Sequence, residues 1–497
     1  MELRRETLRF EQLVTRSEEQ VSIEGEATLP GSMRDAVTVL SVQAQAHVSD
    51  AQAGTDEVAV RGRVCFQVLY TQGDLTRIRA LETSCEFDHA IPLSGVMQGM
   101  RLSAQASVQE TEGFASSGRM TLRALLGVSI EAFETVDRAL VTGVDGGEDV
   151  GLQTRAQGIS FCRSESVGEG KTLVREEFDL PAKLEVGDVL SATATASVGE
   201  LSGGSGRVGV SGVIEVRVLH RAQEAGRPLV VTTHELPYEL AVDAQLAEGS
   251  TPQATAEVTD VMADSTGAEK RRTLRVEAEV TVRLTQCRQS EAELLEDLYS
   301  LSGPELIPVT EALNVHTFEE TMEARESGRI QVTLPKDAPP IDTVLATFVQ
   351  PTLSSVTPDG RRLDAEGVMS VTIVYLPVDS DIPTAVRAHE PFAMTFPIEA
   401  SDGVTATVYA IESSAGPTTS DRAEVRCVLG LRATQHGIRR IVGVTDVEQG
   451  ATRKQEHGFV LVWPAAGESR WETARRLRVA QDALTPAGKN ALLAFRK

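Results

Sequence analysis

The chain has 497 residues, and 72 acidic against 48 basic side chains give it a formal net charge of −24 at pH 7. This acidic balance excludes the basic surface by which proteins bind phosphate backbones or anionic lipids, so nucleic acid is a poor partner. The first residues are charged without an apolar segment behind them, and nowhere do about 18 consecutive apolar residues occur. We therefore expect a cytosolic protein that does not insert into a membrane.

The cysteines are odd in number and lack any Cys-x-x-Cys spacing; they are Cys65, Cys85, Cys162, Cys287 and Cys427. Cys65 and Cys427 fall inside strand patterns, where a small apolar side chain packs well. We predict that all five are reduced and mostly buried, because cytosolic thiols seldom form disulfides.

A set of landmarks returns three times at a period of about 150 residues. Each copy contains a Leu-Pro pair, which starts at Leu29, Leu180 and Leu334. About 40 residues after the leucine, each copy has a predicted strand in which every second residue is apolar. This strand ends at a residue with a ring side chain, which is Tyr70, His220 or Tyr375. An apolar cluster follows, made of Phe87, Ile91 and Leu93, of Leu236, Leu240 and Val242, and of Phe392, Phe396 and Ile398. Three copies of one module favour a scaffold or binding protein over an enzyme.

The dominant local period is two, as in residues 274–284, where apolar and polar side chains alternate. Similar runs lie at residues 37–48, 104–108, 121–130, 404–411 and 424–431. The fold class is therefore mainly β, with three antiparallel β-sandwich or barrel-like modules of six or seven strands. The predicted domains are residues 1–148, 149–300 and 301–450, followed by a small module at 455–497.

Helix signals are few. Ser290–Glu293 forms a capping box ahead of Leu294, Leu295 and Leu298, which predicts a short connecting helix. A second capping box, Ser469–Glu472, opens a helix that carries Trp471, Ala474 and Leu477 on one face. The apolar run 459–463 precedes this helix, and a second helix near 481–484 and the apolar run 491–495 follow it. The C-terminal module is thus predicted as βααβ.

Several short motifs invite a chemical interpretation, and each has a simpler one. Gly204–Gly209 fits G-x-G-x-x-G but precedes a strand, which favours a hairpin loop. The pairs His234-Glu235 and His389-Glu390 lack the spacing of a metal site and are predicted as solvated loop residues. Asp145–Asp149 is predicted as an acidic linker, and His220 as a ring at the edge of a core.

No nucleophile, base and orienting group recur or cluster along the chain. We predict no catalytic residue, no metal and no cofactor, and therefore no enzymatic activity.

The tail from Gly467 through Trp471, Ala474 and Leu477 to Val479 resembles a LysM module, whose opening is usually Gly-Asp-Thr-Leu-Trp-x-Ile-Ala. It departs from that pattern at Arg470, at Thr473 and in the shortened segment Thr485-Pro-Ala. The resemblance implies binding of N-acetylglucosamine chains, and the shortened segment removes part of that groove. The candidate partner- or glycan-binding residues are Gly467, Glu468, Ser469, Arg470, Trp471, Arg475 and Arg478.

The three large copies resemble the SPOCS domain of spore-coat morphogenesis proteins, in which such domains precede a C-terminal LysM module. The resemblance rests on the Leu-Pro pairs, on Val68-Leu-Tyr70, on the Phe-x-x-x-Ile-Pro-Leu of residues 87–93 and on Glu296–Ser300. It implies a non-enzymatic protein of the mother-cell cytosol that ties the forming coat to the forespore surface through a polymerising ATPase.

Two functions stay open at this level. One is an intracellular assembly adaptor, and the other is a cell-wall protein whose tail grips peptidoglycan above a stalk of β-modules. The N-terminus shows no secretion signal, which favours the adaptor. Arginine pairs with carboxylates and stacks on rings, so the basic tail is predicted to bind a protein rather than a glycan, with Trp471 serving in packing.

Replacing Arg470, Arg475 and Arg478 by alanine is expected to abolish partner recruitment while the β-modules stay folded. A pull-down from sporulating cells measures the first effect, and circular dichroism measures the second. Micromolar binding of peptidoglycan or chitin oligomers by the tail, unchanged by these substitutions, would contradict the expectation.

Overall fold

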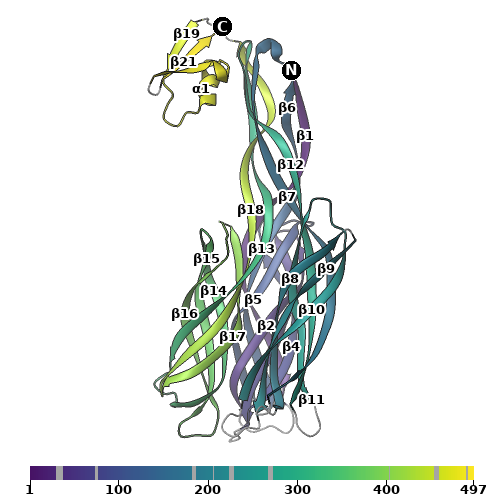
Figure 1. Cartoon of the computed structure of the whole chain (residues 1–497), viewed down its shortest axis with the longest axis vertical. Coiled ribbons are helices and arrows are strands. Elements are labelled where there is room, and N and C mark those ends of the chain that lie inside the picture. The colour runs from purple at the N-terminus through teal and green to yellow at the C-terminus, as the bar shows by residue number, and fades with distance from the viewer. Residues whose placement is uncertain are drawn as a thin grey trace.

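The computed structural model describes residues 1–29, 37–72, 77–181, 186–204, 206–222, 229–266, 272–401, 403–452, 458–488 and 491–496. Three β-modules lie side by side at one end, a stalk of long strands rises from them, and a small C-terminal module lies at the far end of the stalk (Figure 1). No helix within the described ranges is long and apolar enough to cross a membrane.

Each repeat contributes six strands. The first repeat contains β1 (Glu2–Thr28), β2 (Val37–Ala53), β3 (Glu57–Gln72), β4 (Arg79–Pro92), β5 (Arg101–Ser116) and β6 (Arg119–Asp145). The second contains β7 (Leu152–Asp179), β8 (Val186–Gly204), β9 (Gly206–Ala222), β10 (Leu229–Ala244), β11 (Thr251–Thr266) and β12 (Thr273–Ser300). The third contains β13 (Pro304–Thr333), β14 (Ile341–Asp359), β15 (Arg362–Pro377), β16 (Thr384–Phe396), β17 (Val404–Thr419) and β18 (Arg422–Thr452).

The strand order is the same in all three repeats. In the first, one antiparallel sheet has the order β1-β6-β5 and the other has the order β2-β3-β4. The second repeat has β7-β12-β11 and β8-β9-β10, and the third has β13-β18-β17 and β14-β15-β16. The prediction of three antiparallel β-sandwich modules is confirmed, with six strands in each.

The landmark leucines take equivalent places. Leu29, Leu180 and Leu334 are buried. Their backbone N–H groups donate to the carbonyls of Gly118, Arg272 and Asp421, over 3.0, 2.8 and 2.9 Å, in the hairpin that joins the fifth and sixth strands of each repeat. The closing rings Tyr70, His220 and Tyr375 are also buried, at 1%, 0% and 1% exposure. Each landmark therefore marks the same core position, and His220 is a core ring as predicted.

The third landmark cluster needs one correction. On the third strand of each repeat a glycine pairs with an aromatic residue of the fourth strand, giving Gly62 with Phe87, Gly212 with Tyr238 and Gly367 with Phe392. The counterpart of Phe87 in the second repeat is therefore Tyr238, not Leu236, and Val242 takes the place of Ile91. The ring covers the glycine and fills the space that a side chain would occupy.

The stalk consists of the outer halves of the first and sixth strand of every repeat, paired as three antiparallel ribbons. Its apolar core takes residues from all six strands, namely Leu8, Phe10, Val136, Leu140, Ile159, Phe161, Leu294, Leu313, Val315 and Ile441. The prediction of a helix at 290–298 is wrong, because β12 continues through this segment in register with β7. The apolar residues of the segment serve the stalk core, and this tertiary pairing overrides the capping pattern.

The C-terminal module contains β19 (Gly458–Val462), α1 (Arg470–Leu477), a 3-10 turn at Gln481–Ala483, β20 (Leu484–Gly488) and β21 (Ala491–Arg496). Its sheet has the order β19-β21-β20. A small module with one helix agrees with the expected fold class. The predicted second helix is wrong: residues 481–483 form one 3-10 turn, and Thr485–Ala487 lie in β20, paired with β21.

Of the remaining sequence predictions, some are confirmed and others are wrong. Gly204 pairs with Arg207 across a hairpin, as predicted. Residues 148–150 form a 3-10 turn between β6 and β7, in the predicted linker. His234 and His389 lie in β10 and β16, so their placement in loops is wrong. Cys162, Cys287 and Cys427 are buried, whereas Cys65 and Cys85 are partly exposed, and all five are free.

Replacing Gly367 by alanine is expected to destabilise the protein by about 1–3 kcal/mol, because the new Cβ overlaps the Thr352 carbonyl and crowds the Phe392 ring. Chemical denaturation measures this loss. Gly416→Ala in β17 is the matched control, since a Cβ there meets no described atom within 4 Å. Equal effects of the two substitutions would contradict the role assigned to the covered glycine.

Candidate functional site

The C-terminal module packs against the end of the stalk. A shared apolar cluster joins Tyr299 of β12 to residues of the module, which are Val462, Trp471, Ala474, Leu477, Val479, Leu484 and Ala494. The module is therefore held by a core of its own that includes one stalk residue.

Helix α1 buries Trp471, Ala474 and Leu477, and both of its ends are capped. The Ser469 hydroxyl accepts from the N–H of Glu472, while the Ser469 N–H donates to the Glu472 carboxylate and lowers the pKa of Glu472 below its ordinary value. At the other end Arg478 adopts a left-handed conformation with φ of 51°. The next N–H, of Val479, donates to the Ala474 carbonyl and closes the helix.

Asp297 of β12 is the polar centre of the contact. One of its carboxylate oxygens accepts from Trp471 Nε1 at 2.7 Å and from Arg475 Nη1 at 2.9 Å. The Asp297 side chain is only 8% exposed, so both hydrogen bonds are shielded from water. The guanidinium of Arg155 lies 5.3 Å from the Trp471 ring centroid, on the stalk side of the contact.

Tyr299 and Arg478 complete the contact. The Tyr299 hydroxyl donates to the Val479 carbonyl at 2.8 Å, and burial together with the Asp297 charge raises the pKa of Tyr299 to about 12. Arg478 reaches back to the stalk end, where it donates to the carbonyl and hydroxyl oxygens of Ser300 at 2.9 and 2.7 Å and to the Gly303 carbonyl at 3.1 Å. A non-glycine residue in left-handed conformation is costly, and these bonds offset that cost.

The other predicted site residues serve local structure. Gly467 occupies the tight turn before α1 with φ of 86°. Glu468 pairs with Arg476 at 2.9 Å, and the pKa of Glu468 is lowered mainly by this hydrogen bond. Arg470 donates to the carbonyls of Gln481 and Leu484 at 3.1 and 2.6 Å. Of the seven predicted residues, the structure thus brings Trp471, Arg475 and Arg478 together, against this chain's own stalk.

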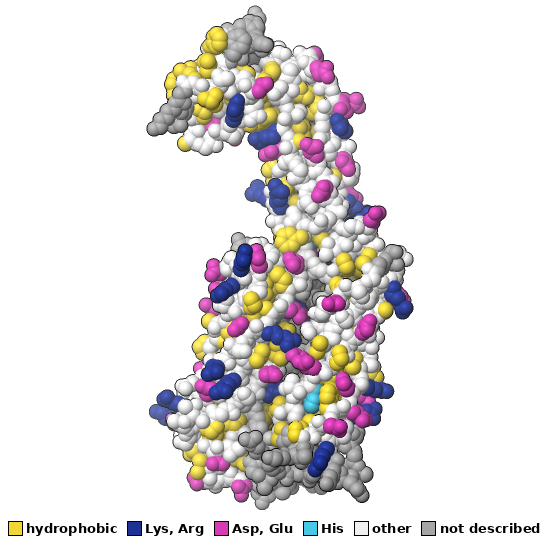
Figure 2. All heavy atoms as spheres, in the orientation of Figure 1, with side chains coloured by type: hydrophobic (Ala, Val, Ile, Leu, Met, Phe, Trp, Pro, Cys, Tyr) yellow, Lys and Arg dark blue, Asp and Glu magenta, His cyan; other side chains and the backbone are white. Residues whose placement is uncertain are grey.

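Sequence analysis missed an exposed apolar surface on the same module. Phe459, Leu461 and Trp463 alternate along β19 and beyond it, and are 72%, 48% and 62% exposed. Within the described part of the chain, β19 pairs with β21 alone, so it is an edge strand. Figure 2 shows hydrophobic side chains gathered on this module. The signal was present in the alternation at 459, 461 and 463, which was used only to predict a strand.

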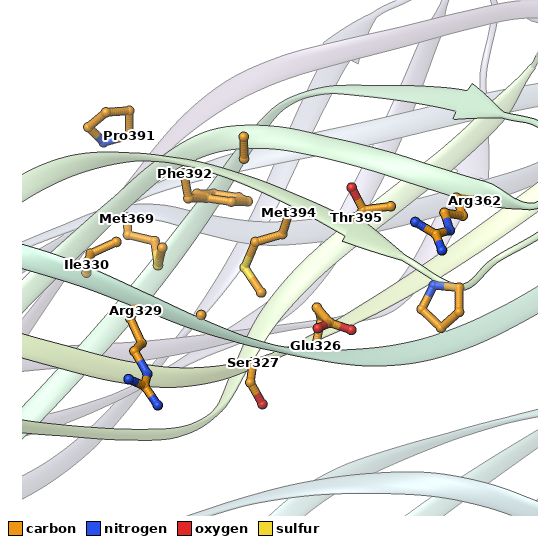
Figure 3. A pocket seen from close by; sticks show the side chains of 13 residues that line it. Glu326, Ser327, Arg329, Ile330, Arg362, Met369, Pro391, Phe392, Met394 and Thr395 are labelled. Atoms are coloured by element: carbon orange, nitrogen blue, oxygen red, sulfur yellow. The ribbon is translucent and has the colours of Figure 1, made fainter.

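A hollow lies in the third repeat, between β13 and β16 (Figure 3). It has a volume of about 640 Å³, with Met369, Phe392 and Met394 on its apolar side and Arg329 and Arg362 at its ends. Among the described residues that line it, none is a histidine, cysteine or aspartate. The hollow follows the gap between the edges of two sheets.

Residues 35–112 match the family model described as "SipL, SPOCS domain". The matched segment contains β2, β3, β4 and most of β5, and the same strands recur in the same order in the second and third repeats. The family model covers none of the C-terminal module. No curated protein and no solved structure matches the chain.

Asp297→Ala is expected to loosen the C-terminal module from the stalk by about 1.5–3 kcal/mol, because the substitution leaves the Trp471 N–H and the Arg475 guanidinium without their acceptor. The chain has two tryptophans, so in a Trp463→Phe background the fluorescence reports Trp471 alone. The emission should move to longer wavelength, and quenching by acrylamide should rise.

Glu291→Ala, at an exposed carboxylate of the same strand, serves as the control. An unchanged Trp471 spectrum in Asp297→Ala would show that the module does not depend on this contact.

Proposed function

We propose that this protein is a non-enzymatic assembly adaptor of the spore coat that works in the mother-cell cytosol. The observation that carries the proposal is that the module matched to the SPOCS domain recurs three times in one chain and supports a stalk with a separate module at its end. Three fused modules and a stalk hold the C-terminal module at a fixed distance from the body of the repeats. A catalytic function needs no such spacing.

The surface proposed for the partner is the edge strand β19 with Phe459, Leu461 and Trp463. An edge strand offers unpaired backbone N–H and C=O groups, which can form hydrogen bonds with a strand of a partner protein. Every second side chain of the edge strand can then contact the partner and determine the specificity of binding. Exposed aromatic side chains are enriched among the residues that dominate binding energy at protein interfaces. The proposed occupant is an extended segment of a coat protein, with the polymerising ATPase implied by the resemblance as the first candidate.

The resemblance of the C-terminal module to a LysM module is also part of this proposal. A glycan ligand is the weaker alternative, because Trp471 packs against Tyr299 with ring centroids 5.0 Å apart and is only 6% exposed. It therefore offers no free ring to a sugar. Arg475 and Arg478 are likewise engaged with the stalk, so the triple arginine substitution would act through loss of docking.

The test is a pull-down from sporulating cells with the full chain, with a chain that ends at residue 452, and with a variant that carries Phe459→Ser, Leu461→Ser and Trp463→Ser. The triple variant is expected to lose at least about 100-fold in capture of the coat ATPase, since two or more hot-spot side chains are removed. Phe114→Ser is the matched control, because Phe114 is 62% exposed on the first repeat.

Sedimentation with purified peptidoglycan forms the second arm of the experiment. Retained ATPase capture by the triple variant would contradict the assigned surface. Tight sedimentation of the full chain with peptidoglycan, without capture of any coat protein, would contradict the adaptor and favour the cell-wall function.

A further inference from the structure

Buried polar side chains gather where the three modules meet the stalk. Eighteen residues before each landmark leucine, on the first strand of every repeat, stand Glu11, Cys162 and His316. The sixth strand of each repeat carries a matching position, which lies fifteen residues after the carbonyl group that accepts the hydrogen bond from the landmark leucine. The residues at this position are Phe133, Cys287 and His436. All six are buried, with 6% exposure or less. They form two rings of equivalent positions, and at each position the three repeats have different side chains.

The rings are in contact with one another. His316 Nδ1 lies 3.6 Å from Cys162 Sγ and 3.5 Å from Glu11 Oε2. The His316 and His436 ring centroids are 5.4 Å apart, and Phe133 packs against both. Glu319 of β13 adds a carboxylate whose oxygen is 3.7 Å from His436 Nδ1. One donor atom from each of His316, Glu319 and His436 lies within 4.8 Å of the other two.

Some nitrogens of the two histidines lack a hydrogen bond from the described residues. His316 Nε2 and both nitrogens of His436 are buried without a hydrogen-bond partner among the described residues. His436 Nε2 lies 2.8 Å from a Glu131 oxygen, within ion-pair distance. Buried polar atoms are nearly always paired, because an unpaired one loses its water without compensation. The unpaired His436 Nδ1, which lies 3.7 Å from a Glu319 oxygen, therefore points to a missing ligand.

We propose that His316 and His436, each through Nδ1, and Glu319 bind a first-row divalent metal ion, with Zn²⁺ the first choice and the Cys162 thiolate as a fourth ligand. Two imidazoles, a carboxylate and a thiolate are a donor set that zinc prefers, and four ligands close a structural site.

Charge balance agrees with this assignment. The cluster holds the carboxylates of Glu11, Glu131 and Glu319 against the guanidiniums of Arg16 and Arg101, which leaves one negative charge in excess. A divalent cation together with one thiolate brings this sum to zero. Arg101 bridges Glu11 and Glu319 at 3.1 and 3.2 Å and so holds one proposed ligand from its outer side.

The ion would join β13 and β18 of the third repeat to β7 of the second, at the level where the stalk leaves the modules. One layer towards the stalk end, Phe10 and Phe161 meet with ring centroids 6.1 Å apart and separate the cluster from the rest of the stalk core. The assigned role is structural, because Phe133 and Cys287 fill the remaining ring positions and the proposed ligands leave no open position for a substrate.

The test begins with the full chain, purified through a tag without histidines. Elemental analysis should find about one zinc per chain, and the metal-free protein should bind Co²⁺ with the visible absorption of a tetrahedral site and a thiolate-to-cobalt charge-transfer band. His436→Gln and Glu319→Gln should each weaken binding by at least about 100-fold, given that outer partners of metal ligands alone contribute roughly 10–100-fold.

His220→Tyr is the matched control. It removes a buried histidine of the second repeat and restores the ring found at Tyr70 and Tyr375, so metal binding should stay unchanged. Circular dichroism checks that each variant is folded, and the titration of the unmodified chain needs no variant. Absence of saturable binding of Zn²⁺, Co²⁺, Fe²⁺ and Mn²⁺ by that chain would overturn the proposal, as would equal metal binding by folded His436→Gln.

Discussion

The whole structure depends on six strands of 27 to 31 residues that run unbroken from the modules into the stalk. The first and sixth strands of each repeat pair as one antiparallel ribbon. Because side chains alternate between the two faces of a strand, the same ribbon must point apolar side chains into the module core along one half and into the stalk core along the other. Bulges absorb the change between the two surroundings; they occur at Leu13/Thr15, Leu284/Thr285 and His316/Phe318, close to the level where module passes into stalk. Because the ribbons are continuous, the modules cannot turn independently of the stalk.

A smaller apolar cluster fixes the modules to one another. Leu40 and Leu69 of the first, Leu190 and Leu219 of the second, and Leu345 and Val374 of the third lie together in one buried group. The modules therefore touch through their second sheets as well as through the stalk. This double attachment, in the stalk and between the second sheets, makes the three repeats one body.

The repeat architecture could be predicted from sequence because it rests on period-two alternation and on landmarks such as Leu29, Leu180 and Leu334, whose core positions are local consequences of the pattern. The helix predicted at 290–298 failed because the same apolar residues satisfy a strand when β7 lies beside them. The docking contact of the C-terminal module was harder to predict, because it also depends on tertiary contacts. Asp297 reads as one more acidic residue in an acidic chain, and only the tertiary contact with Trp471 shows its role.

Fusing three copies into one chain allows each to differ at equivalent positions, which identical subunits cannot do. The position of Asp297 on the stalk is held by Gly143 in the first repeat and by Asp446 in the third, and the position of Tyr299 by Asp145 and Glu448. Asp446 is exposed and pairs with Arg5. Only the second ribbon thus offers both a buried carboxylate and an aromatic ring to the C-terminal module. The tail follows β18 of the third repeat in sequence, yet it packs on β12 because the chemistry of that ribbon, not its proximity along the chain, selects the docking position.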